Sequence, residues 1–118
     1  MYTKLCTLNV SGLAGKHKRI QVFEWLQQNK FNLCFLQELD CTKTSYNLWR
    51  NEWKYDLFLS GNNSKSLGIG ILCNNLPCSY FEHNDIIPGR LQSLRLLFKT
   101  TVTFLLMYMA IITIIPHY

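Results

Sequence analysis

The sequence predicts an α/β fold, because two apolar, strand-like segments flank a segment with helical periodicity. The first strand is expected over residues 4–10, where side chains alternate between two faces, and the second over residues 32–37, a nearly continuous apolar run. Between them, residues 16–29 carry apolar side chains near helical spacing. A strand–helix–strand unit of this kind predicts a right-handed crossover between the two strands.

The rest of the chain continues to mix helix and strand. Residues 61–64 and 74–77 have turn compositions, and residues 99–100 are expected to join a hairpin. Gly68 and Gly70 lie inside a strand pattern, where glycine indicates a bulge or a close approach of backbone. The further elements expected are a helix over residues 42–53 and strands over 55–59, 67–73, 91–98 and 102–108.

Length and composition indicate one domain or part of one. The chain has 118 residues, at the short end of the usual domain range. Its 48% hydrophobic and 14% aromatic content excludes a disordered protein as the default. The net charge of +5 fits a polyanionic partner such as nucleic acid, although ordinary variation in surface charge explains it equally well.

The five cysteines indicate a reduced protein. Their number is odd and no C-x-x-C pair occurs, so a disulfide scaffold or a zinc site is not expected. Cys6 and Cys34 lie in strand patterns, where a free thiol behaves as a small hydrophobic side chain. The first residues lack the apolar core of a secretory signal peptide. We therefore expect an intracellular protein, nuclear or cytoplasmic.

Two polar side chains stand at the ends of the first two predicted strands. Asn9 lies near the end of the first strand, and Glu38 follows the second directly. Ligands of open α/β sheets bind outside the carboxyl ends of strands. A glutamate with an asparagine beside it suits a hard cation and a phosphate. By spacing alone, however, such residues are more often simple polar residues at a strand exit.

Several short motifs follow one another in a recognisable order. They are T-L-N-V-S-G at residues 7–12, H-K-R at 17–19, W-L at 25–26, L-Q-E at 36–38, S-L-G-I-G-I-L at 66–72 and G-R-L at 89–91. Together they resemble the endonuclease/exonuclease/phosphatase family, and most closely the apurinic-type endonuclease domain of non-LTR (LINE-type) retrotransposons. The resemblance covers most of residues 4–104. It implies the N-terminal half of a four-layer α/β sandwich, in which two packed β-sheets are flanked by helices, and therefore an incomplete domain.

The resemblance also implies a chemistry. In that family the glutamate that matches Glu38 binds the catalytic Mg²⁺, for which Mn²⁺ is a substitute, and Asn9 would help to orient the phosphate and the metal shell. The reaction is the metal-assisted hydrolysis of a phosphodiester bond in DNA. Asn9 and Glu38 are accordingly the expected catalytic and metal-binding residues, and Mg²⁺ is the expected cofactor.

Basic residues supply the expected contacts to DNA. Lys16, Lys18 and Arg19 cluster at the start of the first predicted helix, and Arg90 follows a glycine at a strand start. Such cations can contact backbone phosphates, which makes binding dependent on salt. The alternatives are a solvated helix face for the cluster and a turn-capping surface cation for Arg90. No obligate protein partner is evident from the sequence.

Motifs from the second half of the family domain do not occur in this sequence. G-D-F-N and S-D-H are both missing, and His117 lacks a preceding aspartate. A general base and a phosphate-binding histidine are therefore not present, so little or no catalysis is expected from this chain alone. The alternative is a non-catalytic binding protein or an α/β fragment with a membrane tail.

The last residues form a separate apolar tail, so residues 1–104 are expected to be the partial nuclease domain and 105–118 the tail. Residues 100–118 contain no charged side chain, but the apolar run is short for a membrane span, and membrane association is not expected. The codons for M-Y-M-A at residues 107–110, read in a shifted frame, can encode V-Y-G. The neighbouring codons permit the longer string I-N-V-Y-G-N-N, which is compatible with the next strand motif of the family. We hypothesise a frameshift near Leu105. Genomic DNA that lacked downstream codons for G-D-F-N in that frame would contradict it.

Overall fold

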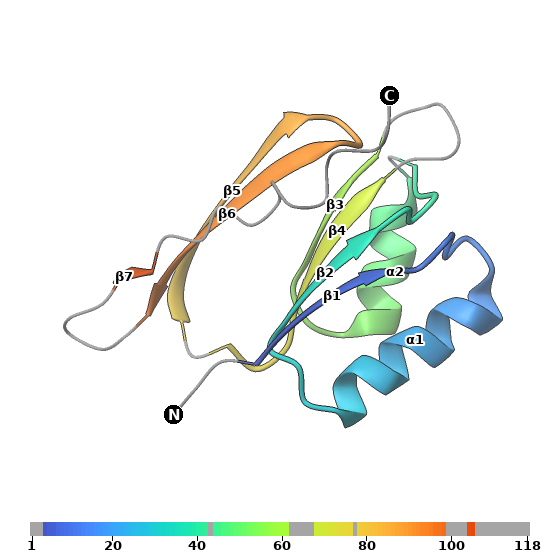
Figure 1. Ribbon diagram of the computed structural model, residues 1–118, viewed down its shortest axis with the longest axis horizontal. Helices are drawn as coiled ribbons and strands as arrows, with labels where there is room; N and C mark the ends of the chain where they lie inside the picture. The colour runs from blue at the N-terminus through green and yellow to red at the C-terminus, as the bar shows by residue number, and fades with distance from the viewer. Residues whose placement is uncertain (1–3, 43, 62–67, 77, 99–103, 106–118) are drawn as a thin grey trace.

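The protein folds into three layers in its computed structural model, which describes residues 4–42, 44–61, 68–76, 78–98 and 104–105. Two helices cover one face of a four-stranded sheet, and a three-stranded sheet faces its other side (Figure 1). This confirms the predicted α/β fold with two packed sheets. One helical layer lies within the described part of the chain, so the outer face of the second sheet has no helix over it there.

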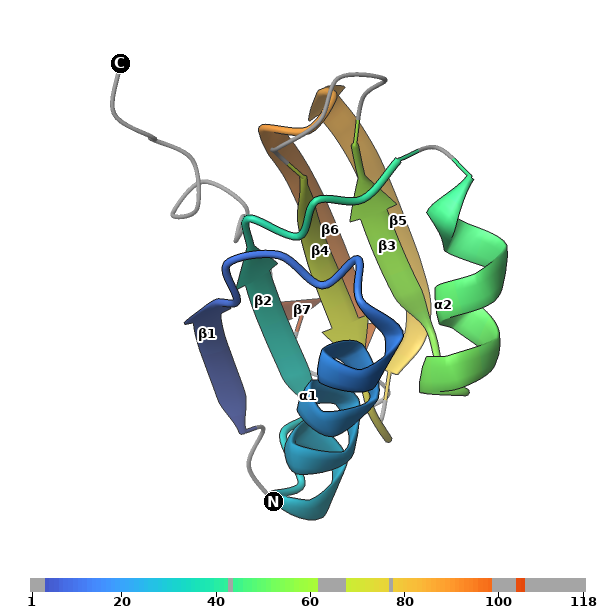
Figure 2. The same cartoon turned by 90° about the vertical axis from the view of Figure 1, so that its right-hand side faces the viewer.

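The first unit follows the sequence prediction closely. Strand β1 (Leu5–Asn9), helix α1 (Lys16–Gln28) and strand β2 (Leu33–Gln37) form a strand–helix–strand unit. The two strands are parallel, with Leu5 opposite Leu33 and Asn9 opposite Gln37. Their carboxyl ends therefore meet at one edge of the sheet, which is the upper edge in Figure 2.

Two more strands complete the first sheet. Helix α2 (Ser45–Trp53) leads into strand β3 (Leu57–Ser60), and strand β4 (Ile69–Cys73) then inserts antiparallel between β2 and β3. The strand order is β1-β2-β4-β3, so β1 lies at one margin of the sheet. The helix and both strands were predicted, and each begins slightly later than the sequence pattern indicated.

The two glycines at strand β4 lie in close packing, as predicted. A Cβ atom on Gly70 would lie 2.7 Å from Cδ1 of Leu39, and one on Gly68 would lie 2.8 Å from Sγ of Cys41. Gly68 also has a φ of +148°, a backbone conformation that residues with a side chain rarely adopt. The chain after β2 therefore packs closely against β4 at these two positions, where a side chain would have to displace Leu39 or Cys41.

The second sheet departs from the prediction. It contains strand β5 (Cys78–Ile87), strand β6 (Leu91–Phe98) and the short strand β7 (Phe104–Leu105), all antiparallel. Strand β5 was not predicted, because its polar run at residues 82–85 breaks the apolar alternation that indicates a strand. Strands β6 and β7 do pair, while most of the predicted partner strand over 102–108 lies outside the described residues.

Strand β2 is buried on both faces, so apolar side chains pack in two layers around it. The layer between the helices and the first sheet has at its centre Val10, Leu13, Phe23, Leu26, Cys34, Leu36, Leu39, Cys41, Trp49, Trp53, Leu57 and Leu72. The layer between the two sheets consists of Leu33, Phe35, Ile71, Cys73 and Leu94, with Phe58 and Leu76 at its margin. These two layers hold the strand ends, and thus the candidate site, in place.

Within the described residues, no helix has the length and apolar character needed to cross a membrane. The predicted apolar tail at residues 106–118 lies outside the described part of the chain. The expectation about the tail and the proposed division at residue 104 therefore stay predictions.

Candidate functional site

Asn9 and Glu38 meet at the edge where β1 and β2 end. Nδ2 of Asn9 donates a hydrogen bond of 2.6 Å to Oε2 of Glu38. The amide oxygen of Asn9 accepts from the backbone N–H of Ser11 at 3.0 Å, which fixes the orientation of the amide. The structure thus brings the two sequence-predicted site residues into direct contact, both with exposed side chains.

The backbone of Glu38 adopts a left-handed conformation. Its φ is +55°, a value that costs a residue other than glycine roughly 1–2 kcal/mol. The chain on both sides holds it there: the carbonyl of Glu38 accepts from N–H of Gly12 at 2.6 Å, and N–H of Leu39 donates to the carbonyl of Gly68 at 3.0 Å. Backbone strain that the surroundings enforce is a frequent property of functional positions.

The donor atoms suit a hard cation better than a soft one. The pair offers one carboxylate, that of Glu38, because Asn9 turns its amide nitrogen toward that carboxylate and its amide oxygen accepts from Ser11. Mg²⁺ is commonly bound by one or two carboxylates together with water and substrate phosphates. Among the described residues, no three His, Cys, Asp or Glu side chains gather closely enough to hold a metal ion by themselves. The residues present therefore fit an open Mg²⁺ site that water and phosphate complete, and they do not fit a closed zinc site.

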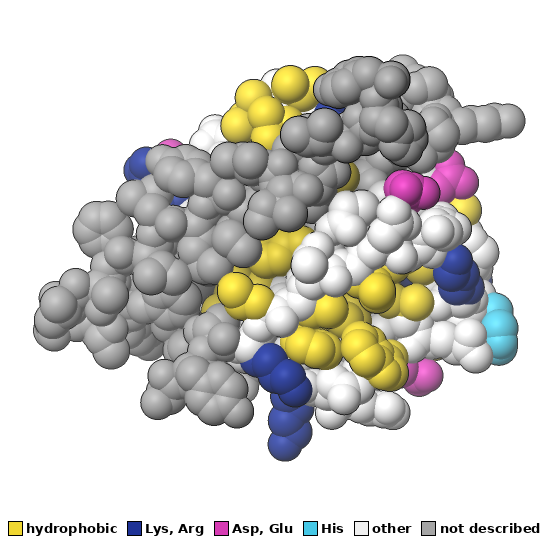
Figure 3. Space-filling view, in the orientation of Figure 1, with side chains coloured by type: hydrophobic (Ala, Val, Ile, Leu, Met, Phe, Trp, Pro, Cys, Tyr) yellow, Lys and Arg dark blue, Asp and Glu magenta, His cyan; other side chains and the backbone are white. Residues whose placement is uncertain are grey.

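Two of the predicted basic residues lie on the surface near this edge. Lys16 and Lys18 are exposed in the first turn of α1. Nζ of Lys18 donates to the carbonyls of Val10 (2.6 Å) and Ser11 (3.2 Å), so it also braces the loop that follows β1. Figure 3 shows basic and histidine side chains beside the start of α1, with acidic side chains near the ends of the strands.

Arg19 has a structural role, and the expectation that it lies on an exposed helix face is wrong. Its side chain is only 2% exposed. Nε and Nη2 bind the two carboxylate oxygens of Glu52 at 2.6 and 2.9 Å, and Nη1 donates to the carbonyls of Leu13 and Ala14. The guanidinium also lies over the ring of Trp49, 5.1 Å from its centroid. All of its nitrogens are engaged, so none is left to contact a phosphate.

Arg90 lies in the turn between β5 and β6, and its side chain is exposed. Ser60, at the end of β3, holds this turn against the first sheet. Oγ of Ser60 accepts from the N–H of Gly89 at 2.7 Å and donates to Oδ1 of Asp85 at 2.6 Å. The turn therefore lies at the same edge as the ends of β1 and β2 (Figure 2). Ser60 was not predicted as a site residue, because its only sequence signal is a serine before a glycine turn.

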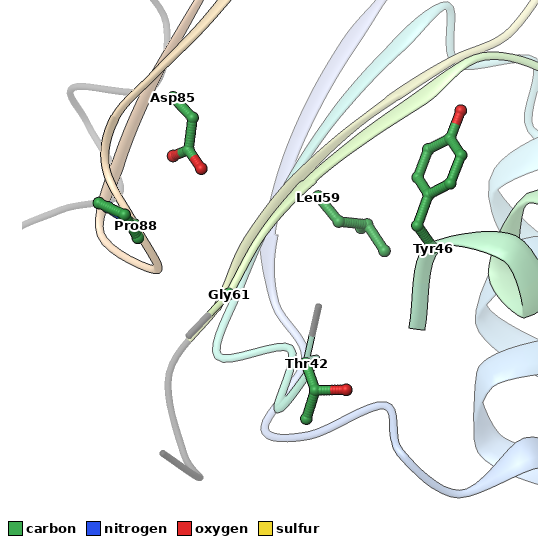
Figure 4. A pocket seen from close by; sticks show the side chains of 6 residues that line it. All are labelled: Thr42, Tyr46, Leu59, Gly61, Asp85 and Pro88. Atoms are coloured by element: carbon green, nitrogen blue, oxygen red, sulfur yellow. The ribbon is translucent and has the colours of Figure 1, made fainter. Parts of the chain in front are cut away.

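A hollow of about 310 Å³ lies near the end of β3. Figure 4 shows Asp85 and Pro88 on the β5–β6 hairpin and Tyr46 on α2, with β3 running between them. Thr42, Leu59 and Gly61 complete the lining. Neither Asn9 nor Glu38 lines this hollow, so it is separate from the candidate metal site.

Comparison with known proteins identifies a similar transposon protein. No protein-family model matches the chain. The chain is 30% identical over 96 residues to "Transposon TX1 uncharacterized 149 kDa protein" of Xenopus laevis. The match covers 80% of this chain but only 7% of the relative. The chain is thus similar, over most of its length, to a small part of a much longer transposon protein.

Proposed function

We propose that this chain carries part of the metal site of a retrotransposon-derived, Mg²⁺-dependent DNA endonuclease, and that the chain alone does not cleave DNA. The observation that carries the proposal is the hydrogen bond between Asn9 and Glu38 at the carboxyl ends of two parallel strands. The similarity to a transposon protein supports the proposed origin.

The two side chains have different roles in this proposal. The carboxylate of Glu38 would hold the ion directly, and the amide of Asn9 would orient that carboxylate and donate to a phosphate oxygen. A bound Mg²⁺ would neutralise charge on the scissile phosphate. Lys16, Lys18 and Arg90 would contact the DNA backbone, which makes binding weaken as salt rises.

Hydrolysis needs more than these residues supply. In the described part of the chain, the hydrogen bond of His83 goes to the amide oxygen of Gln92, and no histidine is paired with a carboxylate. A general base that activates water is therefore not assembled there. We expect the purified chain to leave supercoiled plasmid DNA intact in the presence of Mg²⁺ or Mn²⁺.

Calorimetric titration with Mn²⁺, followed by competition with Mg²⁺, tests the metal site. The Glu38→Gln variant keeps the size of the side chain but removes its charge, so we expect its Mn²⁺ affinity to fall at least tenfold. The matched control is Glu24→Gln, which removes an exposed glutamate on α1 and should bind Mn²⁺ like the unaltered chain. Equal affinities for all three proteins would refute the proposed site. Circular dichroism of each variant verifies that the fold is retained.

A further inference from the structure

A second hollow lies at the opposite edge of the first sheet. Figure 2 shows that α2 ends, β3 begins and β4 ends at this lower edge, away from the carboxyl ends of β1 and β2. The hollow has a volume of about 360 Å³, within the range of small ligand pockets. It is lined by Arg50, Lys54, Tyr55, Asp56, Cys73, Asn75 and Leu76.

The walls of the hollow are held by hydrogen bonds between separate elements. Nε1 of Trp53 donates to the carbonyl of Cys73 at 2.9 Å, and N–H of Cys73 donates to the carbonyl of Asp56 at 2.9 Å. Nδ2 of Asn32 donates to the carbonyl of Asn74 at 3.1 Å. These bonds tie α2, β3 and the end of β4 together, so the hollow is formed before any ligand arrives.

Two cations and an aromatic ring meet in this hollow. Tyr55 is 47% exposed, and its ring packs edge-on against Trp53 with the centroids 6.1 Å apart. Arg50 and Lys54 provide positive charge on the side of α2. The ion pair of Arg50 with Asp56 is long, at 3.8 Å, and both side chains are substantially exposed. Such a pair is weak, and a phosphate can displace the carboxylate.

We propose that this hollow binds one nucleotide unit of single-stranded nucleic acid, with the phosphate on Arg50 and Lys54 and the unstacked base on the ring of Tyr55. Guanidinium and ammonium groups bind phosphate oxygens, and single-strand binding proteins stack bases on exposed aromatic rings. The amide of Asn75 can bond to the edge of the base. The site involves neither Glu38 nor a metal ion, so it stands independently of the proposed endonuclease function.

Lys54 allows a structural role and a binding role to be separated. It is the C-cap of α2, with a φ of +76°, a position that glycine occupies at lower cost. A cation at a helix C-terminus also stabilises the helix by itself. In Lys54→Gly the lower backbone cost of glycine offsets the loss of that cation, so the variant should preserve the thermal midpoint of unfolding while weakening nucleic-acid binding. A purely structural lysine would not show this combination.

Fluorescence anisotropy of the full chain with a labelled oligothymidylate of about ten nucleotides tests the proposal. We expect Tyr55→Ala to weaken binding on the order of tenfold. Lys54→Gly should also weaken it, and should reduce the slope of log K against log salt by about 0.7, the loss of one phosphate contact. The matched control is Lys30→Gly, which makes the same change at an exposed residue after α1 with a φ of +58°.

The results of the anisotropy assay either support or overturn the proposed site. Weaker binding by Tyr55→Ala and Lys54→Gly, but not by Lys30→Gly, supports the site. Competition by thymidine monophosphate then identifies the source of the nucleotide unit. Poor competition supports a strand as the ligand, and competition as efficient as that of the oligonucleotide overturns this and indicates a free nucleotide. Unchanged affinity in both hollow variants, or no binding of the oligonucleotide at low salt, overturns the proposal. Equal loss in Lys30→Gly and Lys54→Gly also overturns it, because it indicates a general effect of charge.

Discussion

At the scale of single residues, the position of Glu38 follows from the sequence but its conformation does not. Its place after an apolar strand run predicts the edge at which it lies. The left-handed φ is held by two hydrogen bonds to residues far away in the chain: the carbonyl of Glu38 accepts from the N–H of Gly12, and the N–H of Leu39 donates to the carbonyl of Gly68. Local pattern cannot reveal such bonds. The direct contact with Asn9 was likewise only implied by the order of the strands.

The buried thiols give a prediction at the same scale. Burial raises the pKa of Cys34 to about 12 and that of Cys41 to about 11. We expect both to resist iodoacetamide at about pH 8 in the native state and to react on unfolding, because the thiolate is the nucleophile. Mass spectrometry after timed alkylation measures this. Rapid native-state labelling of either cysteine would contradict the burial.

The same shifts fix the sign of a pH dependence. Because the pKa of each thiol is higher in the folded state than the ordinary value of 9.0, folding favours the protonated form. The associated stability is fully present below about pH 9 and is lost as the pH rises toward the folded-state values. Urea unfolding at increasing pH should therefore show a falling free energy of unfolding in that range. A Cys34→Ala variant should show a shallower fall.

At the scale of elements, Arg19 shows why a charge cluster in a sequence is ambiguous. Lys16, Lys18 and Arg19 look alike in the sequence, but the rotation of α1 turns Arg19 inward to Glu52 of α2. The helical pattern predicted that a helix exists there. It did not predict which cation joins the two helices, since that depends on where α2 packs.

Breaking the buried ion pair between α1 and α2 should destabilise the fold strongly. Arg19→Ala leaves the carboxylate of Glu52 buried without its partner, so we expect a loss of about 3 kcal/mol in the free energy of unfolding, measured with urea. Lys16→Ala, on the exposed face of the same helix, should change it by less than about 0.5 kcal/mol. A small effect of Arg19→Ala, similar to that of Lys16→Ala, would show that the pair is dispensable.

The link from β3 to the β5–β6 turn is a second element-scale prediction. Ser60→Ala leaves the buried N–H of Gly89 without an acceptor, which should cost about 1–3 kcal/mol in the free energy of unfolding. Asp85→Asn keeps an oxygen that can accept from Ser60 and should cost less than about 0.5 kcal/mol. Thermal unfolding followed by circular dichroism compares the two variants. The reverse order of effects would contradict the described geometry.

At the scale of the whole molecule, the sequence predicted the first sheet far better than the second. The strands and helices of the first sheet have strong apolar patterns that reflect burial on one or both faces. Strand β5 carries the polar residues Glu82, Asn84 and Asp85, so its side chains do not predict a strand. Its backbone pairing with β6 stabilises the strand conformation instead. The packing of one sheet on the other depends on long-range contacts, so it followed from the family resemblance and not from local pattern.

The arrangement also places the two proposed sites at opposite edges of one sheet. Glu38 and Asn9 lie where β1 and β2 end, and the hollow beside Tyr55 lies where β3 begins (Figure 2). Binding of a metal ion at Glu38 should therefore affect only one edge of the sheet. NMR resonances of residues at that edge should shift when the metal is added, while resonances of residues that line the hollow should not.

Titration of the ¹⁵N-labelled chain with Mg²⁺, observed by NMR, tests the metal site most directly. The side-chain amide of Asn9 donates to Glu38, so its resonances should shift progressively, together with the backbone amides of Glu38 and Leu39. The shifts should disappear in Glu38→Gln and persist in Glu24→Gln. Resonances at this edge that stay unchanged with Mg²⁺, or that shift equally in the Glu38→Gln variant, would contradict the account.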